Sequence, residues 1–366
     1  MAFNAVYIKN RRYLVLFGIV FFISFFNKNF CQYSFYDDNL TDTIYFKSED
    51  VLEKSEKRPI FEQVVLNAPI SDGSTEILKR KGILTRYENA KATIILCHGF
   101  TSDKFDMGVL RHLFPKGMYN TLTFDFRAHG EDAHQQLCTF GKNEVHDVAA
   151  AVHFVKNHQL LKDKPIFAYG FSMGAVSAIE SQARYQNFFD AMILDCPFGS
   201  SETVIKNGLS KMKVNLFGYE FKIPGISFLE RYAFNRYVQL FIKYALRIMS
   251  HSDSKHINTE IYPLYPAESV KKITVPCFFI HCKHDEKIPT DDIRMMYENA
   301  PGFKRLWITN GRKHYDSLFY NPERYRKRIR KFLKSVLDKS YIDQPSSLIW
   351  EDSHDELVTA LVAPAA

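Results

Sequence analysis

The stretch from Pro165 to Ile179, PIFAYGFSMGAVSAI, constrains the fold of this chain more than any other. An apolar, β-favouring run leads into Gly170-Phe-Ser172-Met-Gly174, and a helix-forming run follows from Ala175 to Arg184. This order predicts a buried strand, a tight turn with a serine at its tip, and a helix. The glycines leave room for strand and helix to approach, and the N–H groups that begin a helix favour a developing negative charge. Ser172 is therefore predicted to be a nucleophile; the alternative is an ordinary Gly/Ser turn.

Four further motifs lie on either side of this turn: His98-Gly99-Phe100, Asp125-Phe-Arg127-Ala-His129-Gly130, Asp285-Glu-Lys-Ile-Pro289 and Gly311-Arg-Lys-His314. Together, and in this order, the five motifs resemble those of the α/β-hydrolase family, from about Phe61 to Leu337. The resemblance implies an α/β fold with a mostly parallel central sheet, helices on both faces and a helical cap insertion. It also implies a serine hydrolase with Ser172, Asp285 and His314 as the catalytic residues. The backbone N–H groups of Phe100 and Met173 would form the oxyanion hole.

Two residues compete for catalytic roles. Asp195 ends the predicted strand Ala191–Asp195 and is an alternative to Asp285 as the acid, although Asp285 lies in the better motif. His129 is an alternative base, but its motif resembles a structural turn of the family.

The same turn contains a predicted ion pair and two departures from the family pattern. Asp125 and Arg127 are expected to pair and to fix the loop. Ala128 stands where the family usually has glycine, and Asp132 where it usually has serine, so the resemblance does not determine the conformation of this loop.

The insertion is predicted between the strand ending at Asp195 and the strand that delivers Asp285. Its composition shifts to Tyr, Phe, Lys and Arg, and Phe228 to Met249 has the apolar spacing of a long amphipathic helix. We expect this helix to lie over Ser172 with the side that carries Tyr237, Phe241 and Tyr244 turned inward; the alternative is a helix that only packs on the core. The expected domains are a signal peptide or membrane anchor (1–31), a linker (32–57), core (58–198), cap (199–266), core (267–340) and a loosely held C-terminal tail (341–366).

The N-terminus combines basic residues with an apolar run. Lys9, Arg11 and Arg12 precede Tyr13–Phe26, which is short for a membrane-spanning helix and typical of a secretory signal. No small-x-small cleavage site follows, so an uncleaved anchor is the alternative. We expect an exported protein, periplasmic or secreted, or one anchored in a membrane.

Composition excludes some partners and leaves others open. The 366 residues carry a formal charge of +7, with no basic-aromatic module, so no nucleic-acid partner is expected. A basic C-terminal helix, from Asn321 to Asp338, leaves membrane association open. The six cysteines are spread through the chain and are expected to be buried free thiols. The run His281-Cys-Lys-His284-Asp285 has residues of metal-binding type, but a strand alternates its side chains, so no metal is expected. The predicted serine-hydrolase reaction needs no cofactor, and none is expected.

The predicted reaction is hydrolysis of a small-molecule ester, thioester or other acyl substrate through an acyl-enzyme intermediate. A serine peptidase or an acyltransferase would use the same residues, and a non-catalytic binding protein would keep the fold while losing one of them. The sequence leaves the natural substrate, the acyl length and the oligomeric state open.

Overall fold

The computed structural model describes residues 58–133, 136–210, 213–216, 219–222, 228, 231–235, 237–240 and 258–352. The predicted signal segment and linker (1–57), and Phe241 and Tyr244 of the predicted cap, lie outside the described residues. No helix in the described ranges has the length and apolar character needed to cross a membrane.

A nine-stranded sheet forms the centre of the fold, in the order β1-β2-β4-β3-β5-β6-β9-β10-β11. Only β1 with β2 and β2 with β4 are antiparallel; all other neighbours are parallel. The strands are β1 (Ile60–Pro69), β2 (Ile77–Arg86), β3 (Ala92–Cys97), β4 (Tyr119–Phe124), β5 (Ile166–Phe171), β6 (Ala191–Asp195), β9 (Cys277–Cys282), β10 (Lys304–Thr309) and β11 (Ser347–Glu351). The central strands β3, β4, β6 and β9 are buried along their whole length, as a sheet covered on both faces requires. The predicted α/β fold is confirmed.

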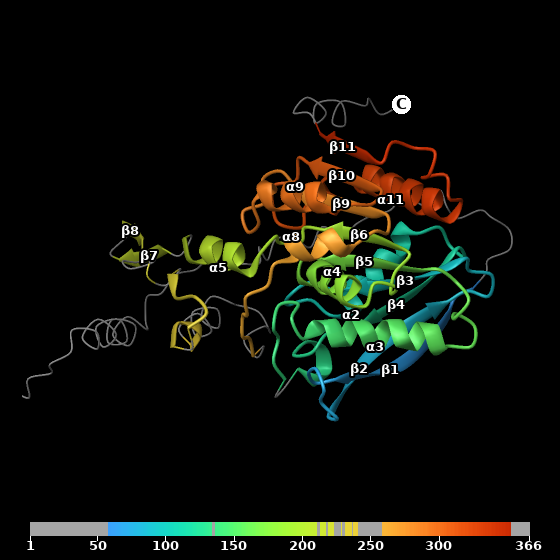
Figure 1. Cartoon of the computed structure of the whole chain (residues 1–366), viewed down its shortest axis with the longest axis horizontal. Coiled ribbons are helices and arrows are strands. Elements are labelled where there is room, and N and C mark those ends of the chain that lie inside the picture. The colour runs from blue at the N-terminus through green and yellow to red at the C-terminus, as the bar shows by residue number, and fades with distance from the viewer. Residues whose placement is uncertain are drawn as a thin grey trace, which may run out of the picture.

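Helices cover both faces of this sheet (Figure 1). One face packs against α3 (Glu144–Asn157), α4 (Met173–Tyr185), α8 (Pro266–Ser269), η5 (Val270–Lys272) and α9 (Thr290–Asn299). The other face packs against α2 (Lys104–Gly108), η2 (Val109–Leu113) and α11 (Pro322–Leu337), and α10 (Ser317–Tyr320) leads into α11. A short turn, η3 (Gly130–Asp132), follows β4.

The insertion between β6 and α8 extends beyond the carboxyl ends of the strands. It contains α5 (Ser201–Ser210) and the hairpin β7 (Lys213–Leu216) and β8 (Tyr219–Lys222), which lie to one side of the sheet (Figure 1). The expected continuous helix from Phe228 to Met249 is wrong in its first part, because residues 232–235 form a turn. The Asn235 side chain then accepts a hydrogen bond from the Tyr237 N–H at 3.0 Å and begins a new helical turn over residues 237–240.

The segment predicted to be a loose C-terminal tail contains a strand. β11 pairs in parallel with β10, and Trp350 packs against the apolar core between the sheet and α11. After the strand, Asp352 is buried and accepts a hydrogen bond from the indole N–H of Trp307 at 3.0 Å. The prediction of a loose tail is therefore wrong for residues 347–352, because a short apolar run finds an open sheet edge that only the folded chain provides.

The basic helix α11 is less solvated than its composition suggests. Arg324 forms an ion pair with Asp352 at 3.1 Å, and Arg330 donates to the carbonyl of Leu113. The guanidinium of Arg328 lies 4.6 Å and 4.5 Å from the ring centres of Trp307 and Trp350. Much of this positive charge is thus used in holding α11 and β11 to the sheet.

Candidate active site

The turn between β5 and α4 holds Ser172 in a strained conformation. Its φ of 50° and ψ of −117° lie outside the regions that L-residues favour. Both glycines of the motif are required by contact: a Cβ on Gly170 would lie 2.4 Å from the Cα of Ala175, and one on Gly174 would lie 2.1 Å from the carbonyl oxygen of Cys97. The Ser172 N–H donates to the Asp195 carbonyl at 2.8 Å, which ties the turn to the end of β6. The close packing of β3, β5 and α4 therefore dictates the Gly-x-Ser-x-Gly spacing.

His314 and Asp285 come from the loops after β10 and β9, and both belong to one hydrogen-bonded path that ends at Ser172. The Nε2 atom of His314 lies 2.8 Å from Ser172 Oγ, and its Nδ1 lies 2.7 Å from Asp285 Oδ2. Burial alone would raise the pKa of Asp285, but the charge of His314 and its hydrogen bond outweigh this and hold the pKa below its ordinary value. Because an ionised carboxylate only accepts, Nδ1 of His314 carries the proton and Nε2 is free to accept one from Ser172.

The second carboxylate oxygen of Asp285 also accepts hydrogen bonds. Oδ1 accepts the backbone N–H groups of Lys287 and Ile288 at 2.8 and 3.0 Å. The Asp285-Glu-Lys-Ile turn thus fixes the carboxylate so that Oδ2 faces the imidazole.

The residues predicted for the oxyanion hole lie on two turns that touch. Met173 is the first residue of α4, and Phe100 follows the His98-Gly99 turn at the end of β3. The tight contact of Gly174 with the carbonyl oxygens of Cys97 and His98 brings these two turns together.

Hydrogen bonds hold the turn that carries Phe100. His98 donates from Nδ1 to the Gly99 carbonyl at 2.7 Å and accepts the Phe126 N–H at Nε2. Burial lowers the pKa of His98 to about 4, so the ring stays neutral and can donate from Nδ1 while it accepts at Nε2.

The rival candidates have other partners. Asp195 is buried, and its carboxylate is bonded to Tyr325 OH at 2.6 Å rather than to His314. His129 is buried and directs Nδ1 to the Arg127 carbonyl at 2.9 Å, and burial lowers its pKa to about 3. Neither residue takes the position that His314 and Asp285 occupy at Ser172.

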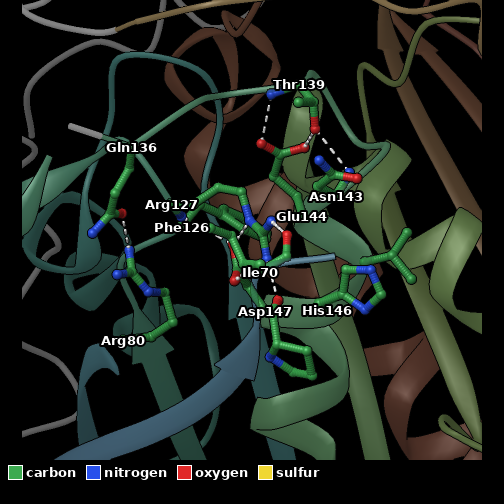
Figure 2. Close-up of polar contacts among 12 residues, drawn as sticks. Ile70, Arg80, Phe126, Arg127, Gln136, Thr139, Asn143, Glu144, His146 and Asp147 are labelled. Atoms are coloured by element: carbon green, nitrogen blue, oxygen red, sulfur yellow. Dashed lines mark hydrogen bonds and ion pairs between the residues drawn. The ribbon is translucent and has the colours of Figure 1, made fainter. Parts of the chain in front are cut away.

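The predicted pair of Asp125 with Arg127 is wrong. Asp125 pairs with Lys104, whose ammonium lies 2.7 Å from Oδ2, whereas Arg127 pairs with Asp147 of α3 at 2.9 Å. Arg127 also donates to the carbonyl of Ile70, so it joins the end of β1, the loop after β4 and the start of α3 (Figure 2). Neighbouring residues on a turn point apart, and each of these charges finds its partner on another element.

Ala128 adopts the conformation that explains the glycine usual at this position. Its φ is 61°, in the left-handed region, and its side chain is fully buried. The loop keeps its turn despite the substitution, held by Arg127 on one side.

An aromatic residue that the sequence analysis did not single out lies beside Phe100. The Phe140 ring is 4.7 Å from that of Phe100, and it also contacts residues of the insertion. Its backbone has a φ of 54°, held by Glu144, whose buried carboxylate accepts the N–H groups of Thr139 and Gly141, both at 2.8 Å. Figure 2 shows Thr139 and Glu144 at this turn. Two features of the sequence could have predicted this turn: the glycine that follows Phe140 and the carboxylate of Glu144 at the start of a helix.

The described part of the insertion is attached at this same loop. Cys138 and the returning segment 258–260 exchange two backbone hydrogen bonds, of 2.8 and 2.9 Å. Val238 is buried with Ile205 and Ile261, whereas Tyr237 is 71% exposed. The prediction that Tyr237 is turned inward is therefore wrong: the new helical turn at Asn235 directs Val238 into the small apolar cluster with Ile205 and Ile261 instead.

Among the described residues, one group combines three side chains of metal-binding type: Cys196, Asp285 and His314, with donor atoms within 4.8 Å of one another. Asp285 and His314 are already bonded to each other, and burial raises the pKa of Cys196, which favours the neutral thiol over the thiolate that a metal needs. We therefore interpret the group as part of the hydrogen-bonded site. The described cysteines, Cys97, Cys138, Cys196, Cys277 and Cys282, are buried free thiols, as predicted.

The fold and this geometry together describe a class: a mostly parallel α/β sheet that presents a serine on a strained strand-to-helix turn. The family model described as "Alpha/beta hydrolase family" matches residues 94–328, and the chain belongs to that family. A curated relative, the uncharacterized protein YqkD of Bacillus subtilis (strain 168), is 29% identical over 264 residues, which cover 71% of this chain and 77% of the relative.

Solved structures share the fold at lower identity. The esterase Pf2001 of Pyrococcus furiosus is 23% identical with a TM-score of 0.54, and the match covers 76% of this chain and 93% of that one. The alpha/beta hydrolase GrgF of Penicillium sp. sh18 is 18% identical with a TM-score of 0.55, and the match covers 76% and 99%.

Proposed function

We propose that this chain is a serine hydrolase that cleaves a carboxylic ester or thioester through an acyl-enzyme intermediate. The observation that carries the proposal is the continuous hydrogen-bonded path from Ser172 Oγ through His314 to Asp285. Membership of the alpha/beta hydrolase family supports the same chemistry.

Each residue has a defined part in the proposed reaction. Ser172 Oγ attacks the carbonyl carbon while Nε2 of His314 takes its proton and later passes it to the leaving group. Asp285 holds the imidazole tautomer and stabilises the imidazolium. The N–H groups of Met173 and Phe100 receive the oxyanion, and each such donor is worth about 3 kcal/mol in other oxyanion holes. Water activated by His314 then releases the acyl group.

The proposed substrate is a small molecule with an apolar acyl group. The support is local: the rings of Phe100 and Phe140 lie together beside the turn that carries one oxyanion donor. A peptidase or an acyltransferase would begin with the same attack and differ only in the leaving group or in the acceptor of the acyl group.

Two further parts of the proposal concern the cap and the location of the protein. The insertion, residues 199–266, would cover Ser172, and replacing Phe241 with Ala would then change the preference among acyl chain lengths. The N-terminal apolar segment would direct export or anchor the protein; recovery of the full-length protein from the soluble cytoplasm would contradict this.

Labelling with a fluorophosphonate, followed by a panel of esters of increasing acyl length, tests the function. The wild-type protein is expected to label at Ser172 and to hydrolyse at least one ester. Ser172→Ala should lose both activities while its thermal unfolding stays close to that of the wild type. Labelling that persists at another serine, or a wild-type protein that neither labels nor hydrolyses any ester, would overturn the proposal.

A further inference from the structure

A second carboxylate is buried directly behind the Ser172 turn. Asp195, 3% exposed, ends β6, and its Oδ2 accepts a hydrogen bond from Tyr325 OH at 2.6 Å. That hydroxyl also lies 2.5 Å from the hydroxyl of Tyr169, on the strand that leads into Ser172. On the other side, Oδ1 of Asp195 accepts the thiol of Cys196 at 3.2 Å. Because Tyr325 and Cys196 both donate to this buried carboxylate, and Tyr169 holds the hydroxyl of Tyr325, the position of the carboxylate is tightly determined.

The main chain of Asp195 holds the strained serine. Its carbonyl accepts the Ser172 N–H at 2.8 Å, and Phe171 pairs with Asp195 in the β5–β6 register. The next residue, Cys196, has a φ of 50°, so the end of β6 is strained as well as the end of β5. Asp195 therefore connects α11, through Tyr325, to the backbone at Ser172.

Asp195 is also close to the pair formed by His314 and Asp285. The Sγ atom of Cys196, which is hydrogen-bonded to Asp195, lies within 4.8 Å of a side-chain nitrogen of His314 and a carboxylate oxygen of Asp285. Burial raises the pKa of Asp195 to about 6; the hydrogen bonds from Tyr325 and Cys196 and the charge of His314 oppose that rise, and the charge of Asp285 adds to it. The charges on Asp195 and His314 are thus linked.

The remaining ionisable neighbours of this cluster come from β9 and from the turn after it, where burial lowers the pKa of Lys287 and the charge of Asp285 opposes that shift. The Cys282 thiol interacts with that of Cys196, and the imidazole of His281 lies 3.9 Å from Asp285 Oδ2. Burial lowers the pKa of His281, so that ring is neutral near pH 7. The negative charges of this cluster are then those of Asp195 and Asp285, and Lys287 is a basic side chain that interacts with Asp285.

We propose that Asp195, fixed by Tyr325 and Tyr169, is a positioning residue of the hydrolase site: it holds the turn at Ser172 and supplies a second negative charge to the imidazolium of His314. The catalytic part of this inference rests on the proposed function. Asp285 orients the imidazole through a direct hydrogen bond, and Asp195 acts on it through space from the neighbouring strand.

The test follows the titration of the His314 imidazole by NMR in the full-length chain, with His314→Gln to assign the signal. Asp195→Asn removes the charge and keeps the shape, and Tyr325→Phe removes the hydrogen bond that stabilises the ionised form. Both should move the titration midpoint of His314 to lower pH, Asp195→Asn by more. Asp190→Asn, at the opposite end of β6, removes an exposed carboxylate that bonds the Ile166 N–H and should leave the midpoint in place.

Because the titration is read without turnover, its outcome is independent of whether the chain hydrolyses esters. An unchanged midpoint in folded Asp195→Asn and Tyr325→Phe would overturn the electrostatic role. If the wild type shows esterase activity, the acid limb of kcat/KM should shift in the same direction. A uniform loss of kcat/KM, equal to the loss of folded protein and without a shift in pH, would reduce Asp195 to a structural residue.

Discussion

Replacement of Asp285 by Asn tests the proposed mechanism most directly, because the structure dictates how the new amide will lie. Two backbone N–H groups, from Lys287 and Ile288, donate to Oδ1 of Asp285. In the Asp285→Asn variant the amide oxygen must take that place, since the amide nitrogen would face two donors. The amide nitrogen is therefore directed at His314 Nδ1, which must then accept.

This reversal gives His314 the wrong tautomer. With Nδ1 accepting, the proton moves to Nε2, which can no longer take the proton of Ser172 Oγ, 2.8 Å away. The expected loss is about 10⁴-fold in kcat, which corresponds to about 5 kcal/mol of transition-state stabilisation. The fluorophosphonate labelling rate should fall with it, because labelling needs the same proton transfer.

The assay compares kcat for the best ester of the panel in Asp285→Asn and in Asp195→Asn, with thermal unfolding of each variant as a check on folding. Asp195→Asn changes a neighbouring charge and no hydrogen bond to His314, so its loss should stay within about tenfold. A folded Asp285→Asn protein within tenfold of the wild type, or a larger loss for Asp195→Asn, would refute the assignment of the acid.

Three further predictions concern packing and charge. Gly174→Ala places a Cβ 2.1 Å from a backbone carbonyl oxygen, so denaturant unfolding should show a loss of about 3 kcal/mol or more. A double-mutant cycle should give a coupling above about 1 kcal/mol between Arg127 and Asp147 and almost none between Arg127 and Asp125; the reverse would restore the pairing expected from sequence. The folded pKa of Asp195 lies at about 6, above its unfolded value, so its contribution to stability is full below about pH 4 and is lost as pH rises through 6. Relative to Asp195→Asn, the wild type should lose about 3 kcal/mol of unfolding free energy between pH 4 and pH 7, and a constant difference would contradict the burial argument.

The sequence by itself determined the fold and the positions of the candidate site residues. β3 and β6 are buried and almost entirely apolar runs, and glycines stand where a Cβ would strike backbone, as at Gly170 and Gly174. These are local requirements of close packing between consecutive elements, so they leave a readable pattern in the chain.

The tertiary structure decided which distant groups pair. Arg127 pairs with Asp147 rather than with its neighbour Asp125. β11 pairs with the edge strand β10, and no local sequence pattern predicts that this edge is open to it. Tyr325 lies in a helix whose composition is basic and typical of a solvated surface, yet its hydroxyl reaches the carboxylate of Asp195, 130 residues earlier. Such contacts depend on the distance between side chains after the sheet has formed. The apolar periodicity of a sequence predicts which face of a helix or strand is buried. It does not predict which polar group of another element a buried side chain will contact.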